Sequence, residues 1–270
     1  MRPNSARAAY FLASAAVAAA LALSVAGCKT TGDDITGSVS AASVPRSDAD
    51  WRHELSVWGG RYRDNPSDPE VAIAYARALR ATDQRAQAVA VLEQASIRNP
   101  HNMPLLGAYG RALAAAGDYN QALDVLGRAH TPDQPDWRIL NAQGAVLDQL
   151  GRHTEAQRHY SAALKIKPDE ASILSNLGLS YALGRDLQRA EATLRQAMGR
   201  PDATPKVRQN LALVVGLEGR FAEAEKIASA DLPADEAAAN VKYLREMLAQ
   251  RSAWSKKMGR HKIPPPDAGA

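Results

Sequence analysis

Residues 137–170 read WRILNAQGAVLDQLGRHTEAQRHYSAALKIKPDE, and their pattern decides the fold. The same pattern recurs every 34 residues, in blocks that begin at positions 69, 103, 137, 171 and 205. The eighth position of each block is small: Ala76, Gly110, Gly144, Gly178 and Ala212. The twentieth position is an alanine in every block. A fixed period of this length, with helical spacing in each half of the block, predicts stacked helix-turn-helix units.

Large apolar residues fill two other columns of the repeat. The eleventh column holds Leu79, Leu113, Leu147, Tyr181 and Val215, and the twenty-fourth holds Leu92, Leu126, Tyr160 and Leu194. We expect the small residues of columns eight and twenty to face each other where the two helices of a unit cross. The large residues are then expected to fill the space between neighbouring units, so that stacking creates one continuous core.

The turn between the two helices of a unit calls for a left-handed residue, which glycine supplies most easily. Gly117, Gly151 and Gly219 occupy this column in three blocks. Asp83 and Arg185 occupy it in the other two, and in the fourth block Gly184, one step earlier, is expected to take the role instead.

The columns resemble the tetratricopeptide repeat, a helix-turn-helix unit of this period. The predicted fold class is therefore all-α: a tetratricopeptide-repeat solenoid of about five repeats over 69–232, closed by a capping helix at each end. Before the repeats, residues 49–68 carry one apolar helical face, formed by Trp51, Leu55, Trp58 and Tyr62. After them, residues 233–258 carry a similar stripe of Val241, Leu244 and Leu248, and 259–270 form a proline-containing tail predicted to be disordered.

The start of the chain predicts export and lipidation. Residues 1–27 combine Arg2 and Arg7 with an uncharged apolar run, which is typical of a signal peptide. The run ends in Val25-Ala26-Gly27-Cys28, which resembles the lipobox of bacterial lipoproteins, with the Cys28 sulfur as the lipid attachment point. Two alternatives stay open: cleavage near Ala20-Leu21-Ala22 to give an ordinary secreted protein, and an uncleaved apolar anchor.

Residues 28–48 are rich in Thr, Ser, Gly and Asp and predict a flexible tether with a reach of about 25 Å. Lys29 follows the cysteine, in place of the Asp that commonly retains lipoproteins in the inner membrane. We therefore expect a chain anchored by its N-terminal lipid to the outer membrane and facing the periplasm.

Composition excludes several classes of function. Loss of Arg2 and Arg7 with the signal peptide lowers the net charge of +4 to about +2, which leaves no electrostatic argument for nucleic acid. A single cysteine excludes an intrachain disulfide framework and any CxxC motif. His153 and His159 are six residues apart and do not share a helical face as metal ligands would. No metalloprotease, phosphate-loop or nucleophile-elbow motif occurs, so we predict a protein that is not an enzyme and has no cofactor.

Protein binding is the function that the architecture favours. In tetratricopeptide-repeat proteins the first helix of each unit lines the concave surface, and columns two, five, six, nine, twelve and thirteen point into it. The predicted partner-binding groove contains Arg77, Arg80, Arg111, Asn141, Asp148, Asn176, Leu179, Asn210 and Leu213. Asn176 and Asn210 share column six, and their amides suit the backbone of an extended peptide, although surface asparagines on helices are also common. The arginines suit a carboxylate or are simply solvated, and Leu179 and Leu213 suit either a partner or the C-terminal helix.

Particular segments resemble the TadD-type lipoproteins of the Tad (Flp) pilus machinery. They are Trp58-Gly59-Gly60-Arg61-Tyr62 with Asn65-Pro66, Tyr75 to Ala81, Gln87 to Glu93, and Ala237 to Arg245. The resemblance implies a pilus-assembly lipoprotein that helps to place or assemble the outer-membrane secretin, so the implied partner is the secretin or another component of that machinery. Two alternatives remain: a generic periplasmic tetratricopeptide-repeat lipoprotein that serves another envelope complex, and a structural adaptor anchored in the inner membrane.

Overall fold

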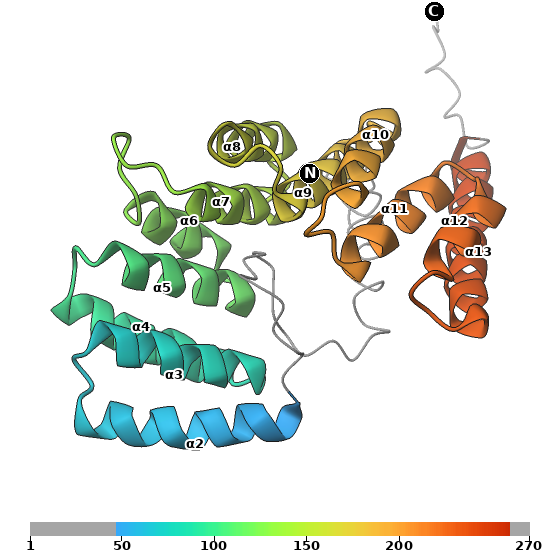
Figure 1. The fold of residues 1–270 in the computed structure, drawn as a ribbon. Helices are drawn as coiled ribbons and strands as arrows, with labels where there is room; N and C mark the ends of the chain where they lie inside the picture. Colours follow the sequence, from blue (N-terminus) through green and yellow to red (C-terminus); the bar gives the residue numbers. More distant parts are fainter. Residues whose placement is uncertain (1–46, 260–270) are drawn as a thin grey trace, which may run out of the picture. The chain divides into compact units, whose positions relative to one another are not determined.

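The computed structural model describes the backbone of residues 47–259 and the side-chain surroundings of residues 47–250. Regular structure in this range is helical, apart from one isolated bridge between Thr131 and Gln134. The helices are α2 (Asp48–Asp64), α3 (Pro69–Ala81), α4 (Arg85–Arg98), α5 (Met103–Ala116), α6 (Tyr119–Gly127), α7 (Trp137–Gln149), α8 (His153–Ile166), α9 (Ala171–Leu183), α10 (Leu187–Met198), α11 (Pro205–Leu217), α12 (Phe221–Ala228) and α13 (Ala234–Gly259) (Figure 1). The first helices of the hairpins begin at the block starts predicted from the sequence, and the predicted all-α repeat fold is confirmed.

The chain divides into two compact units, and the boundary along the sequence lies between Ala203 and Thr204. The described part of the first unit contains α2 and the four hairpins from α3 to α10. The second contains the α11–α12 hairpin and α13. α2 packs against α3 through buried Trp51 and ends at Asp64, earlier than residue 68, because Asn65 precedes a proline.

Side-chain caps fix where several of the first helices start. Ser47 and Asp50 form a reciprocal capping box at the start of α2. Asp68 accepts hydrogen bonds from the backbone N–H groups of Glu70 and Val71 at the start of α3, and Asn102 accepts one from Leu105 in α5. Because an uncapped helix start leaves backbone donors without partners, these residues help to hold the register of the repeat.

The crossing within each hairpin depends on the small residue of column eight. A Cβ added to Gly110 would lie 2.5 Å from Leu126 Cγ, and one added to Gly178 would lie 2.6 Å from Leu194 Cγ. At Gly144 the obstacle would be the Tyr160 ring, at 2.6 Å. Column eight therefore faces the large residue of column twenty-four in its own unit. The prediction that this large residue fills the space between units was incomplete, because the side chain first covers the crossing glycine.

All five turns inside the hairpins use a left-handed residue in the same column. Gly117, Gly151 and Gly219 have φ of 94°, 74° and 86°. Asp83 and Arg185 adopt φ of 60° and 67° although neither is a glycine. The prediction that Gly184 takes this role in the fourth unit was wrong, since its φ is −75°. The column position, and not the nearest glycine, sets the turn geometry.

Helix contacts in the first unit define its two sides. α3 contacts α5, α5 contacts α7, and α7 contacts α9, whereas the second helices α4, α6, α8 and α10 make no comparable contacts with one another within residues 47–203. Because the first helices lie closer together than the second helices, they form the inner, concave side of the stack of hairpins in the first unit. We call the surface of α3, α5, α7 and α9 that faces away from the second helices the inner face.

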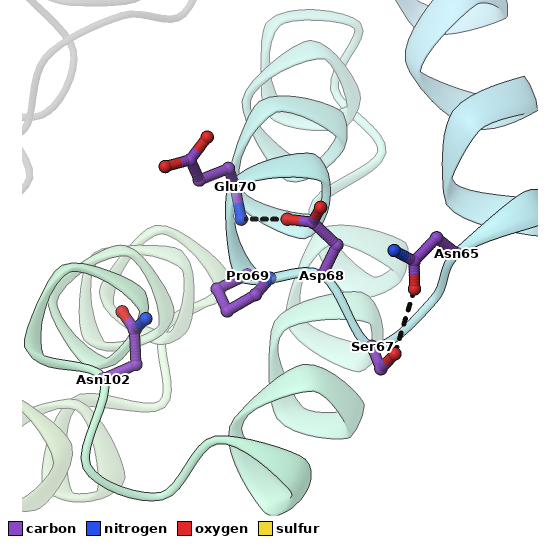
Figure 2. Close-up of a pocket in the computed structure, with 6 residues that line it drawn as sticks. All are labelled: Asn65, Ser67, Asp68, Pro69, Glu70 and Asn102. Atoms are coloured by element: carbon purple, nitrogen blue, oxygen red, sulfur yellow. Dashed lines mark hydrogen bonds between the residues drawn. The ribbon is translucent and has the colours of Figure 1, made fainter.

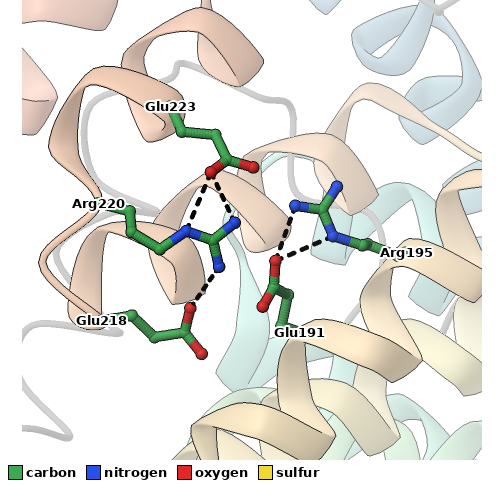
Figure 3. Close-up of polar contacts among 5 residues, drawn as sticks. All are labelled: Glu191, Arg195, Glu218, Arg220 and Glu223. Carbon is green, nitrogen blue, oxygen red and sulfur yellow. Dashed lines mark hydrogen bonds and ion pairs between the residues drawn. The ribbon is translucent and has the colours of Figure 1, made fainter.

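The second unit is built on a close approach between α11 and α13. A Cβ on Gly216 would lie 2.5 Å from Leu244 Cδ2, and Val241 and Leu244 are buried. Arg208 of α11 also pairs with Asp231, next to the loop that leads into α13. Several other ion pairs are short-range surface contacts. Examples are Arg195 with Glu191 in α10 and, within the second unit, Arg220 with Glu218 and Glu223 (Figure 3). Exposed pairs of this kind stabilise a fold only slightly.

Candidate protein-binding face

Four of the nine predicted groove residues, two arginines and two asparagines, lie in different environments. Arg77 on α3 is exposed, and its guanidinium carbon lies 6.0 Å from the centre of the Trp51 ring, which directs it toward α2. Asn141 and Asn176, on α7 and α9, form a hydrogen bond in which Asn176 Nδ2 donates to Asn141 Oδ1 at 3.0 Å. Arg80 of α3 is half-buried.

The asparagine pair differs from the predicted exposed amides. Asn141 is fully buried, at 0% exposure, so its side chain is not available to a partner in this conformation, and its Nδ2 has no hydrogen-bond partner within the described residues. Asn176 is half-buried, with its amide nitrogen committed to Asn141. Its Oδ1 accepts no hydrogen bond within the described residues. The pair therefore joins two repeats, and a partner has access to one of its members.

Arg111 of α5 has a strongly perturbed ionisation. Burial of the guanidinium, followed by the nearby charge of Arg80, lowers the pKa of Arg111 to about 10, against a smaller opposing effect of Asp136. A Cβ on Gly107 would lie 2.7 Å from Ile139 Cδ1 and 3.4 Å from Arg111 Nη1, so the space beside this glycine is filled first by Ile139 of the next repeat. Within the described residues Arg111 makes no hydrogen bond or ion pair.

Asp148 is the centre of a buried polar cluster. Tyr160 donates to its Oδ2 at 3.0 Å, while Ser180 donates to Oδ1 at 2.8 Å and His153 Nδ1 lies 2.9 Å from the same oxygen. Burial raises the pKa of Asp148, although these three contacts favour the ionised form. Burial and the Asp148 charge in turn raise the pKa of Tyr160, which therefore keeps the proton that it donates. The cluster joins α7, α8 and α9.

The predicted role of Asp148 in the groove must therefore be restated. Its side chain is 7% exposed and is shared among three helices, so its main contacts are internal. Ser180 bonds to the carboxylate and not to His153, so the cluster lacks the serine–histidine contact of a Ser-His-Asp triad. The sequence contained one signal of the cluster: a tyrosine replaces leucine in column twenty-four of the block that has an aspartate in column twelve.

Three further predicted residues are half-buried, Leu179 on α9 in the first unit and Asn210 and Leu213 on α11 in the second. Cys28 and the signal peptide lie outside the described residues, as does the tail from residue 260. Among the described residues, no three His, Cys, Asp or Glu side chains are grouped so as to hold a metal ion. In the same range, no helix combines the length and apolar character needed to cross a bilayer.

A polar hollow of about 460 Å³ lies beside the α2–α3 connection and the start of α5 (Figure 2). It is lined by Asn65, Ser67, Asp68, Pro69, Glu70 and Asn102. Asp68 and Asn102 use their side chains to cap α3 and α5, and Ser67 donates to Asn65 Oδ1 at 2.9 Å. Its polar groups thus have structural roles, and we regard the inner face as the better candidate.

Comparison with known proteins agrees with this fold. Residues 80–144 match a family model described as "Tetratricopeptide repeat", and residues 144–184 match one described as "TPR repeat". No curated protein matches the sequence at a significant level. The fold class is a tetratricopeptide-repeat solenoid, and proteins with such repeats bind proteins or peptides and are generally non-enzymatic scaffolds. A protein-binding scaffold is therefore the class that the repeats define.

Several solved structures are similar in fold at low sequence identity. PilW, described as a widely conserved type IV pilus biogenesis factor, is 16% identical, with a TM-score of 0.63 over 72% of this chain and 91% of PilW. The Cut9–Hcn1 hetero-tetramer of APC/C gives 14% identity and a TM-score of 0.58 over 73% of this chain and 40% of the other. Human IFIT1, solved as a dimer with PPP-AAAA, gives 15% identity and a TM-score of 0.55 over 68% and 46%. At these identities the likeness concerns the fold alone.

Proposed function

We propose that the protein is a lipoprotein of the outer membrane, facing the periplasm, that assists assembly of a Tad (Flp) pilus by binding the secretin or another component of the machinery. The observation that carries the proposal is a combination of two features: a segment ending in Cys28 that resembles a lipobox, and a tetratricopeptide-repeat body whose inner face presents half-buried side chains from successive repeats. The lipid supplies the membrane attachment, the tether supplies reach, and the repeats supply the binding surface.

Two further observations support the pilus setting. The sequence segments around Trp58, Tyr75 and Ala237 resemble TadD-type lipoproteins. The fold is similar to that of PilW, a pilus biogenesis factor, over nine-tenths of the length of that protein. Because a repeat fold serves many partners, the pilus setting rests on these resemblances and on the predicted lipid anchor, and not on the periodicity itself.

The experiment is deletion of the gene in the native host, followed by measurement of surface pili and of secretin multimers in the outer membrane. We expect both to fall, and wild-type gene expression to restore them. A matched strain that expresses Arg195→Gln, a change to an exposed ion pair on α10, controls for expression and folding. Normal pili and normal secretin multimers in the deletion strain would contradict the proposal and favour an adaptor for another envelope complex.

A further inference from the structure

The last helix of the second unit, α13, becomes less buried along its length. It packs against α11 and α12, and its buried apolar residues end at Leu244. Met247 and Leu248 are half-buried, and Gln250 is exposed. The helix nevertheless continues to Gly259, so at 1.5 Å per residue its backbone extends about 16 Å past Leu248. A helix of about ten residues is marginal in water unless another surface stabilises it.

The positive charge of the chain is concentrated at this end. Residues 247–266 contain no Asp or Glu, and residues 267–270 contain one, Asp267. Residues 247–270, which we call the basic end, therefore carry a formal net charge of +4, whereas residues 28–246 carry −2. The five cations of the basic end are Arg251, Lys256, Lys257, Arg260 and Lys262. Such an asymmetry of charge along a chain indicates a partner with negative charge.

A second apolar stripe accompanies these cations along α13. Positions 243, 247, 254 and 258, which hold Tyr, Met, Trp and Met, recur at spacings of four, seven and four and so share one helix face. At the described end of this face, Tyr243 is 53% exposed, although Val241 and Leu244 beside it are buried. Aromatic residues interspersed with Lys and Arg on one helix are typical of segments that lie at a membrane surface.

The observations favour a lipid bilayer over an acidic protein as the anionic partner. A protein surface that pairs with cations does so at fixed positions, whereas the cations here extend past α13 to Lys262. An anionic bilayer offers negative charge over its whole surface and an apolar layer beneath it, which suits cations combined with Trp254 and Met258. The predicted lipid anchor and its tether would also keep the basic end near a bilayer, so that a weak contact is sufficient.

We propose that the basic end of α13 binds the anionic surface of the phospholipid bilayer to which the chain is attached. The inference uses the membrane attachment of the proposed function, but not its pilus role. It gives the chain a second membrane contact, at the C-terminal side of the second unit, in addition to the lipid at Cys28. This contact limits the orientations that the second unit can take relative to the membrane.

Quenching of tryptophan fluorescence by brominated lipids tests the inference on the full-length chain reconstituted into vesicles. The vesicles consist of phosphatidylcholine alone or of phosphatidylcholine with about 30% phosphatidylglycerol, which supplies the negative charge. The contribution of Trp254 is the quenching of the wild type minus that of Trp254→Phe, because the other three tryptophans are common to both chains. We expect this contribution to be about twofold larger, or more, in the anionic vesicles.

Reversal of charge in the basic end should abolish the preference for anionic lipid. The variant carries Lys256→Glu, Lys257→Glu and Arg260→Glu, and its Trp254 quenching in anionic vesicles should fall to the level in neutral vesicles. The matched control reverses three exposed cations of the first unit, Arg128→Glu, Arg158→Glu and Lys165→Glu, and so changes the net charge equally. This control should keep the preference.

A salt titration gives a second measurement on the wild type, which does not depend on how well the variants fold. Raising the salt concentration from about 0.05 M to about 0.5 M should reduce the Trp254 quenching in anionic vesicles by about half or more, because ions screen the attraction. Quenching that is insensitive to salt would contradict a contact made through the cations.

Equal Trp254 quenching in the two kinds of vesicle would overturn the inference and favour an acidic protein as the partner of the basic end. An equal loss in the control variant would overturn it as well, because total charge and not this segment would then attract the bilayer. These outcomes are distinct from those of the gene deletion. Loss of pili together with equal quenching leaves the pilus role and removes the bilayer contact, whereas charge-dependent quenching together with normal pili does the reverse.

Discussion

At the scale of single residues, the fold depends on positions where one atom decides the packing. The column-eight glycines are the clearest case, because the space of their missing Cβ is occupied by the large residue of the facing helix. Gly144 is covered by a tyrosine where Gly110 and Gly178 are covered by leucines, and this tyrosine also bonds to Asp148. Tyr160 therefore has two roles: its ring packs over Gly144, and its hydroxyl belongs to the polar cluster around Asp148.

Gly144→Leu is predicted to destabilise the first unit by about 3 kcal/mol, because even a Cβ at this position would lie 2.6 Å from the Tyr160 ring. Urea unfolding followed by circular dichroism measures the change. Gly127→Leu is the matched control: no heavy atom lies within 4 Å of a Cβ there, so the same substitution should have a small effect. Equal stability of the two variants would show that the crossing is not tightly packed.

The pH dependence of stability is predicted to report on Asp148. Burial raises its pKa above the ordinary value of 3.8, so the folded chain binds the proton more tightly than the unfolded chain does. The stabilisation from the protonated form is complete below pH 3.8 and is lost as the pH rises through the folded pKa. Asp148→Asn removes this dependence while keeping an acceptor for Tyr160 or Ser180.

The measured quantity is the unfolding free energy of the wild type minus that of Asp148→Asn, in denaturant titrations at about pH 3.5 and pH 7. We expect this difference to fall as the pH rises, because the wild type loses stability relative to Asp148→Asn. The loss should be about 1.4 kcal/mol for each unit by which folding raises the pKa of Asp148. A difference that rises with pH would mean that the three hydrogen bonds to Asp148 lower its pKa by more than burial raises it.

At the scale of elements, the helix-turn-helix hairpin keeps its geometry even where its sequence departs from the pattern. Five turns place a left-handed residue at the same column, and in two of them the residue has a side chain. For an L-residue this conformation costs about 1–2 kcal/mol. The packing of the hairpin imposes the left-handed conformation at Asp83 and Arg185. For the same reason Arg185, and not the neighbouring Gly184, is left-handed in the fourth unit.

Arg185→Gly is therefore predicted to stabilise the first unit by about 0.5–1 kcal/mol, because glycine relieves the strain and loses only part of that gain to its more flexible unfolded state. The melting temperature of the full chain measures the effect. Arg185→Ala, which removes the same exposed side chain but keeps a Cβ, should give no such gain. If both substitutions stabilise the protein equally, the side chain and not the backbone was the source of strain.

The sequence predicts the fold of the repeats more completely than it predicts the contacts of the candidate binding residues. The period of 34 residues and the small columns predicted helix starts, hairpins and crossings, because these follow from local spacing and residue size. The contacts of Asn141 with Asn176 and of Asp148 with Ser180 join residues 35 and 32 positions apart, in different repeats. Column numbers place such residues on one face but do not say whether they face a partner or each other. For this reason the groove prediction included two residues whose main contacts are internal.

At the scale of the whole molecule, the proposed function requires three parts to act together: a lipid at Cys28, a tether over 28–48, and the repeat body. The body alone provides a binding surface, and the anchor determines which membrane and which partners that surface meets. Removal of the lipid should therefore change the location of the protein without changing the stability of the repeats, because Cys28 lies before the first described helix, α2.

Cys28→Ser is predicted to move the protein out of the detergent phase in phase-partition experiments, because a serine hydroxyl does not accept the thioether-linked lipid. The precursor should accumulate at full length, since cleavage at a lipobox follows lipidation. The full-length variant purified in detergent micelles should melt at the wild-type temperature, whereas pili should be lost. Lys29→Ala, a change beside the cysteine that keeps the sulfur, is the control and should leave partitioning intact. A Cys28→Ser protein that stays membrane-bound would instead indicate that the apolar run of residues 8–27 is an uncleaved anchor.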